Sequence, residues 1–177
     1  MGLEYVILVD ENDRQLGLME KIEAHEKALL HRAFSVFILN SDNQLMLQQR
    51  ALTKYHSPGL WTNTCCSHQR DGEATIDAAK RRLQEEMGFV TALTEKFSFI
   101  YKASFDNGLT EHEFDHVLVG YYEGVPLLNT DEAHDWKWMS IDAIKQDIIQ
   151  DPNNYTPWFK IIFDKFYQEI HTFIQEK

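Results

Sequence analysis

The segment Leu60–Gln69, LWTNTCCSHQ, contains the only two cysteines of the chain, side by side and close to a histidine. A thiol can donate a proton, and a thiolate can accept one or bind a metal. Side chains alternate between the two faces of an extended segment, so Cys66 and His68 point one way and Cys65 the other. A disulfide between sequence neighbours would close almost no loop and add little stability. We therefore expect two free thiols, with Cys66 available for chemistry and Cys65 buried as a small apolar residue.

A second extended segment, Glu111-His112-Glu113, directs its two glutamates to one face and His112 to the other. His25 and His31 precede the first long strand, and with His68 they bring the number of candidate imidazole ligands to three. Three imidazoles and two carboxylates suit a divalent ion of high coordination number, such as Mn²⁺ or Mg²⁺. Zn²⁺, which usually takes fewer ligands, is the alternative.

The competing interpretation of these histidines is ordinary solvated surface, since the chain has eight of them. We assign that interpretation to the histidines outside the pattern, which are His56, His112, His116, His134 and His171.

The elements that position these groups follow from apolar alternation and turn residues. Strands are predicted over residues 4–9, 15–19, 33–39, 44–49, 97–105, 109–122 and 136–139, with an extended segment over 60–68. A helix is predicted over 74–87, where apolar residues recur at helical spacing and Gly88 provides the stop. A further helix is predicted from Ser140 to about Gln150.

The last predicted helix has Thr156 as N-cap and Pro157 in its first position. Its apolar stripe is formed by Trp158, Ile162, Phe166, Ile170 and Phe173. Strands, one amphipathic helix, more strands and terminal helices predict an α+β fold, an α/β/α sandwich with a mixed sheet. No linker divides the chain, so we expect one domain over residues 1–177.

The formal net charge of −11 argues against nucleic acid or an acidic membrane surface as a partner. A phosphorylated substrate would need a local basic cluster or metal ions to reverse that field. The chain has no apolar run of the roughly 18 residues that a membrane helix needs and no secretory signal pattern. We expect a cytoplasmic protein, a monomer or weak dimer.

The predicted helix over 74–87 and its preceding turn resemble the Nudix box, G-x5-E-x7-R-E-U-x-E-E-x-G-U, where U is aliphatic. The matching positions are Glu73, Arg81, Leu83, Glu85, Glu86 and Gly88, with Phe89 a looser match. Two positions depart, since Ser67 replaces the first glycine and Arg82 replaces the first glutamate of the R-E-U triplet. In Nudix hydrolases the carboxylates of this helix hold the metal ions that activate water. Arg82 therefore puts a positive charge where such a ligand belongs.

The combined pattern resembles type I isopentenyl diphosphate isomerase, a Nudix-fold family, from about Glu4 to Trp158. The family's Trp-Thr-Asn-x-x-Cys-x-His motif is matched by Trp61, Thr62, Asn63, Cys66 and His68. The resemblance implies an isomerase that interconverts isopentenyl and dimethylallyl diphosphate through a tertiary carbocation. The Nudix alternative is a metal-dependent hydrolase of a nucleoside diphosphate derivative, and a non-enzymatic binding protein is a third interpretation.

By the same resemblance Cys66 and Glu113 match the two proton-transfer residues, on opposite faces of the substrate, and which acts first stays open. Tyr101 matches the residue that hydrogen-bonds the catalytic glutamate. Trp158 matches an indole over the carbocation, whose alternative role is a core anchor. A two-residue Asn107-Gly108 loop would turn Tyr101 away from Glu113. We predict instead a three-residue loop with Gly108 in the left-handed position, which sets Tyr101 opposite Glu113.

The remaining matches concern the metal and the diphosphate. The resemblance implies a metal site of three histidines and two glutamates, which are His25, His31, His68, Glu111 and Glu113. Diphosphate contacts match Lys21, Arg50, Lys54 and Arg82. Glu86 matches the carboxylate that helps hold a second ion, Mg²⁺, on the phosphates. In this interpretation Arg82 grips phosphate in a site that does not hydrolyse it.

Overall fold

The computed structural model describes residues 3–175, with side chains to Ile170. This part of the chain contains nine strands, four α-helices and one short 3-10 helix. The strands are β1 (Tyr5–Val9), β2 (Gln15–Glu20), β3 (His31–Leu39), β4 (Gln44–Arg50), β5 (Trp61–Thr62), β6 (Cys65–Ser67), β7 (Leu93–Ser104), β8 (Thr110–Tyr121) and β9 (Ala133–Ser140). The helices are α1 (Lys21–Glu26), α2 (Thr75–Met87), α3 (Ile141–Gln150), η1 (Pro152–Asn154) and α4 (Pro157–Gln175).

The strands form one mixed sheet with β3 at its centre. β3 pairs in parallel with β8 and antiparallel with β1, β4 and β6. β7 pairs with β8, and β9 pairs with β4. In this register His31 lies opposite Glu113, and Ser35 lies opposite Cys66. The centre of the sheet thus brings together groups that are far apart in the sequence.

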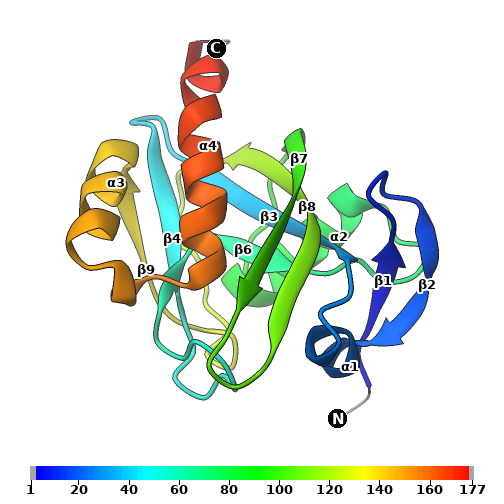
Figure 1. Cartoon of the computed structure of the whole chain (residues 1–177). Helices are drawn as coiled ribbons and strands as arrows, with labels where there is room; N and C mark the ends of the chain where they lie inside the picture. Colours follow the sequence, from blue (N-terminus) through cyan, green and yellow to red (C-terminus); the bar gives the residue numbers. More distant parts are fainter. Residues whose placement is uncertain (1–2, 176–177) are drawn as a thin grey trace.

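Two apolar cores cover the two faces of this sheet, α4 and α3 packing on one face and α2 on the other (Figure 1). The stripe predicted for the last helix is buried at Trp158, Ile162, Phe166 and Ile170, whereas the side chain of Phe173 lies outside the described residues. The α+β sandwich predicted from the sequence is confirmed. No helix among residues 3–175 combines the length and apolar content needed to cross a membrane.

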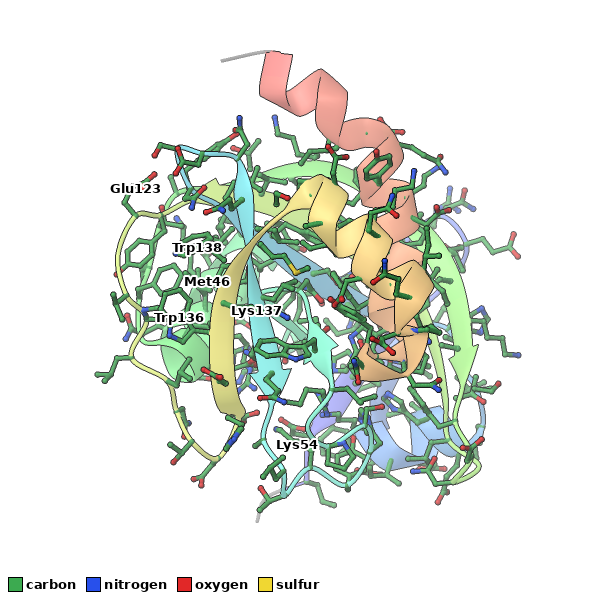
Figure 2. All side chains as sticks on the ribbon, turned by 90° about the vertical axis from the view of Figure 1, so that its left-hand side faces the viewer. Met46, Lys54, Glu123, Trp136, Lys137 and Trp138 are labelled. Atoms are coloured by element: carbon green, nitrogen blue, oxygen red, sulfur yellow. The ribbon has the colours of Figure 1, made fainter. Side chains whose placement is uncertain are left out.

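Alternation along β9 separates the residues that face these two cores. Trp136 and Trp138 lie on one side of the strand with Met46, and Lys137 lies on the other (Figure 2). The Lys137 ammonium lies 4.3 Å from the ring centre of Trp61, a cation–π contact that links β9 to β5.

The segment over residues 60–68, which was predicted to be extended, contains two short strands, β5 and β6. It is broken between β5 and β6, where Asn63 and Thr64 are fully buried. The Asn63 side-chain amide donates to the carbonyls of Val36 and Cys65, at 3.2 and 2.8 Å. Side-chain hydrogen bonds therefore replace ladder bonds at the break and fix the course of the chain into β6.

The β7–β8 hairpin has the predicted three-residue loop, because the N–H of Phe105 donates to the carbonyl of Leu109 at 2.9 Å and leaves residues 106–108 between them. Gly108 has a φ of 83°, and Tyr101 lies opposite Glu113. Gly108 adopts this left-handed conformation without the steric cost that a side chain would impose. The turn therefore sets which face of β7 carries Tyr101.

The N-terminal hairpin is fastened to the sheet through Asp13 in its turn. Arg32 donates to the Asp13 carboxylate at 2.7 Å, and a ring nitrogen of His116 lies 3.0 Å from its other oxygen. The second ring nitrogen of His116 contacts Glu95 at 2.7 Å, so the expectation of a solvated histidine is wrong here. These contacts hold β1 and β2, and with them α1, against the central strands.

Candidate active site

A cavity of about 390 Å³ opens at the end of the central strands, between α1, α2 and the start of α4. It collects most residues that the sequence pattern singles out. Those that line it are Lys21, Arg50, Lys54, Cys66, His68, Arg82, Glu86, Tyr101, Glu111, Glu113 and Trp158. Cys66 and Glu113 therefore face a shared space, although 47 positions separate them in the sequence.

His25, His31, His68 and Glu113 converge beside this cavity. His25 lies on α1, His31 on β3 and Glu113 on β8, and His68 follows directly after β6. One ligand atom from each residue lies within 4.8 Å of the others. Glu111, the predicted fifth ligand, is not in this cluster, although it lies on the same face of β8 and lines the cavity.

The donor set fits a divalent metal ion. Nδ1 of His25 lies 2.5 Å from the carbonyl of Lys21, and Nδ1 of His31 lies 2.9 Å from that of Leu29. These contacts leave each Nε2 as the ligand atom, the arrangement common for metal-bound histidines. The Nε2 of His31 is buried and has no hydrogen-bond partner among the described residues, which a bound cation would correct. Burial lowers the pKa of His25 and lowers that of His68 to about 4, so both rings are neutral, as ligation requires.

Tyr101 connects the two glutamates of β8. Its hydroxyl contacts Glu113 at 2.5 Å and Glu111 at 3.1 Å. Burial raises the pKa of Tyr101, so the phenol keeps its proton and acts as a donor. Burial and the charge of Glu113 raise the pKa of Glu111 to about 8. Burial also disfavours ionised Glu113, but the neighbouring imidazoles of His31 and His68, 3.6 and 3.1 Å from its carboxylate, outweigh it and lower the pKa of Glu113.

Cys66 faces the cavity, whereas Cys65 is fully buried in the core beneath α2. Both thiols are free. Burial raises the pKa of Cys66, and the nearby carboxylates of Glu86, Glu111 and Glu113 add to the effect. Cys66 is therefore a protonated thiol at neutral pH. Its neighbourhood is that of a proton donor, in contrast to the electropositive sites that generate reactive thiolates.

Three of the four lysines and arginines that line the cavity, Lys21, Lys54 and Arg82, pair with carboxylates. Lys21 pairs with Glu4 at 2.9 Å, and Lys54 pairs with Glu132. Six carboxylates and four lysines or arginines line the cavity, so an entering diphosphate meets more negative than positive side chains. A divalent cation accompanying the diphosphate would reverse this balance.

Arg82 and Glu86 form the wall that α2 contributes. The Arg82 guanidinium donates to Glu86 at 2.6 Å and to Glu85 at 2.7 Å. The other oxygen of Glu86 accepts from Gln48 at 3.0 Å, so both oxygens of this buried carboxylate accept a hydrogen bond. The sequence pattern did not single out Gln48, since an amide on a strand carries no distinctive signal.

Aromatic rings line another part of the cavity. Trp158 is almost fully buried, and the Arg50 guanidinium lies 5.1 Å from its ring centre. His56 meets Trp158 edge-on, with 5.5 Å between ring centres. His56 lines the cavity, and burial together with the charges of Arg50 and Lys21 lowers its pKa to about 3. The sequence interpretation of His56 as solvated surface is therefore wrong.

Asp115 is a further acid that the sequence pattern did not predict. It follows Glu111 and Glu113 on the same face of β8, is fully buried and accepts a hydrogen bond from Ser35 at 3.2 Å. Burial and the charge of Glu113 raise its pKa. Its place in the alternation of β8 was the available signal.

Comparison with known proteins gives consistent matches. The NUDIX domain family matches residues 29–159. The chain is 53% identical over 163 residues to an isopentenyl-diphosphate Delta-isomerase of Pectobacterium atrosepticum, covering 92% of this chain and 91% of that protein. It is 50% identical over 162 residues to isopentenyl-diphosphate Delta-isomerase 2 of Aromatoleum aromaticum, covering 92% and 86%. Among solved structures, DR0079 from Deinococcus radiodurans has a TM-score of 0.69 at 20% identity, covering 83% of this chain and 90% of that one, a likeness of fold.

Proposed function

Since this chain belongs to the isopentenyl-diphosphate Delta-isomerases of the Nudix family, we propose that Cys66 and Glu113 are the two groups that exchange protons with its substrate. The protein is an enzyme that interconverts isopentenyl diphosphate and dimethylallyl diphosphate. The observation that carries the proposal is that a protonated thiol and an ionised carboxylate, from β6 and β8, line one cavity.

The reaction moves a double bond by one position. A proton adds to the terminal alkene carbon, which leaves a tertiary carbocation, and a second proton leaves the carbon on the other side of that centre. An isolated alkene is a very weak base, so the donor must be held against it in a site without water. The buried thiol of Cys66 suits the first step in the direction of dimethylallyl diphosphate. The ionised carboxylate of Glu113 suits the second.

Trp158 is proposed to stabilise the carbocation through its indole face. A desolvated cation–π contact contributes about 2 kcal/mol or more. Burial of the ring and its position in the cavity wall support this role, and they also serve the core of α4. The two roles that the sequence suggests for Trp158, contact with the carbocation and anchoring of the core, are therefore compatible.

Lys21, Arg50, Lys54 and Arg82 are the proposed diphosphate contacts, since all four line the cavity. A divalent ion would be held by His25, His31, His68 and Glu113, with Glu111 adjacent, and a Mg²⁺ ion by Glu86 with the diphosphate. When bound, these ions would supply positive charge that neutralises the diphosphate and tunes the proton affinity of the carboxylates. Mn²⁺, Mg²⁺ and Zn²⁺ all suit the histidine cluster.

We propose further that residues 1–177 act as one domain, in the cytoplasm, as a monomer or weak dimer. The acidic net charge supports the absence of nucleic-acid and membrane partners.

Incubation with isopentenyl diphosphate in D₂O tests the function directly. We expect dimethylallyl diphosphate that carries deuterium, because protons from solvent reach both transfer groups between turnovers. Release of phosphate from nucleoside diphosphate derivatives without isomerisation would instead support the hydrolase. Arg82 argues against that outcome, because it pairs with Glu85 and Glu86 where a hydrolase has another metal-binding carboxylate.

Tyr101→Phe is expected to lower kcat by about 10- to 100-fold, with little change in KM, an effect no larger than the lower limit of about 10²-fold for loss of a general acid or base itself. The variant loses the 2.5 Å hydrogen bond to Glu113, which stabilises the ionised carboxylate. The pKa of Glu113 should therefore rise, and activity should be lost at a higher pH as the solution is made acidic. Steady-state rates measured across pH check both effects. An unchanged acid limb would argue against Tyr101 as a positioning residue for Glu113.

A further inference from the structure

We propose that the imidazole of His56, held between Phe105 and Trp158, is the end wall of the catalytic cavity and limits the reaction to short hydrocarbon chains. The inference rests on the proposed function, in which the hydrocarbon lies against Trp158. It assigns His56 a role in substrate selection, in addition to the residues proposed to move protons or bind diphosphate.

His56 separates two hollows. The catalytic cavity of about 390 Å³ and a neighbouring hollow of about 450 Å³ share only Tyr55 and His56 among their described lining residues. Tyr55 is half exposed and lies at the rim, whereas Nδ1 of His56 is inaccessible to solvent. The imidazole is therefore the inner part of the partition. Behind it, the second hollow is lined by Phe105, Tyr155 and Pro157.

Aromatic contacts fix this ring in place. One face of the imidazole stacks on Phe105, with 5.2 Å between ring centres and 20° between planes. Trp158 stands nearly perpendicular to it at 5.5 Å, and Tyr55 does so at 4.4 Å. Arg50 donates to the carbonyl of His56 at 3.3 Å, which restrains the backbone as well. A ring held on three sides acts as a rigid wall.

The ring is also chemically suited to face a hydrocarbon. Burial and the nearby charges of Arg50 and Lys21 keep His56 neutral, so it adds no charge that would repel the carbocation. Nδ1 has no hydrogen-bond partner among the described residues. His56 thus offers mainly a flat aromatic surface here.

This geometry predicts a size limit. With the branched carbon against Trp158, a longer branch would extend toward His56, whose ring centre lies 5.5 Å from that of Trp158. Removing the imidazole would join the two hollows and provide the missing space.

The test compares kcat/KM for isopentenyl diphosphate with that for the homologue carrying a propyl group in place of the branch methyl. In His56→Ala we expect the ratio of homologue to isopentenyl diphosphate to rise at least tenfold over the wild type. His56→Phe rebuilds a wall of similar size and should keep the wild-type ratio. The rate of conversion of each substrate is measured from the formation of its acid-labile allylic diphosphate product.

Leu60→Ala is the matched control, because Leu60 lines only the second hollow. It widens that space without opening the partition, so the ratio should stay at the wild-type value. The proposal would be overturned if His56→Ala converts isopentenyl diphosphate but its kcat/KM ratio of homologue to isopentenyl diphosphate does not rise. That outcome would leave the proposed function intact. A wild-type protein inactive on isopentenyl diphosphate would overturn both.

Thermal melting establishes whether His56→Ala folds. Should it unfold, Phe105→Ala tests the same wall from behind, since the imidazole then loses its stacking surface. We expect the ratio to rise in that variant too. A folded Phe105→Ala with the wild-type ratio would overturn the proposal.

Discussion

Cys66→Ala is expected to reduce the rate of isomerisation by about 10³-fold or more. General acids contribute about 10²- to 10⁴-fold, and an alkene is so weak a base that the loss should lie in the upper part of that range. Cys66→Ser should also be severely impaired, because a hydroxyl is a much weaker acid than a thiol. The appearance of dimethylallyl diphosphate and the incorporation of deuterium from D₂O measure the loss.

Cys65→Ala is the matched control for this experiment. Its thiol lies one residue away and belongs to the core beneath α2. Cys65→Ala should lose some stability through a small cavity but keep its activity within a few fold. Equal losses in the two alanine variants would refute the assignment of the proton donor to Cys66.

The wild-type enzyme offers a pH check on the same residue. An exposed thiol loses its proton near pH 8.5. Because burial raises the pKa of Cys66, activity should not decline through that region from loss of this proton.

Removal of divalent metal is expected to reduce activity to about one hundredth or less. Four ligand atoms lie within 4.8 Å, and the cavity faces the diphosphate with more carboxylates than cations. Without metal, the site should bind the diphosphate poorly, and Nε2 of His31 should lack a hydrogen-bond partner. Metal analysis of untagged protein, followed by chelation and addition of Mn²⁺, Mg²⁺ or Zn²⁺ singly, measures the effect.

Two histidine variants separate the metal site from nonspecific effects of chelation. His25→Ala removes a ligand and should lower the metal content and the activity together. His112→Ala removes the imidazole that lies between the two glutamates in sequence but contacts the carbonyl of Ala28 on the other side of the strand. It should retain its metal. Full activity of thoroughly chelated protein would contradict the proposed site.

The parts of the site that were predictable from sequence depend on local rules. Alternation assigns Cys66 and Cys65 to different faces, and a glycine in a three-residue loop sets Tyr101 opposite Glu113. Both rules need only neighbouring residues. The predictions made from them are met because β6, β7 and β8 are regular next to the site.

Other features depended on contacts that no short pattern contains. The six residues of α1 are too few for helical periodicity, yet they carry Lys21 and His25. The break in 60–68 comes from Asn63, which bonds to a strand 27 positions earlier. His56 is buried by Phe105 and Trp158, from two distant elements. In each case tertiary packing decided the outcome.

The position of α4 after every strand has a consequence for synthesis in the cell. The ribosome makes every described strand before it makes the 19 residues of the helix that covers one face of the sheet. At about 5–20 residues per second, synthesis of this helix takes about one to four seconds, and longer if translation stalls. Phe37 and Phe166, stacked at 4.2 Å in the finished enzyme, are separated during this interval. The apolar face of the sheet that α4 covers therefore gains its partner only in the last stage of synthesis.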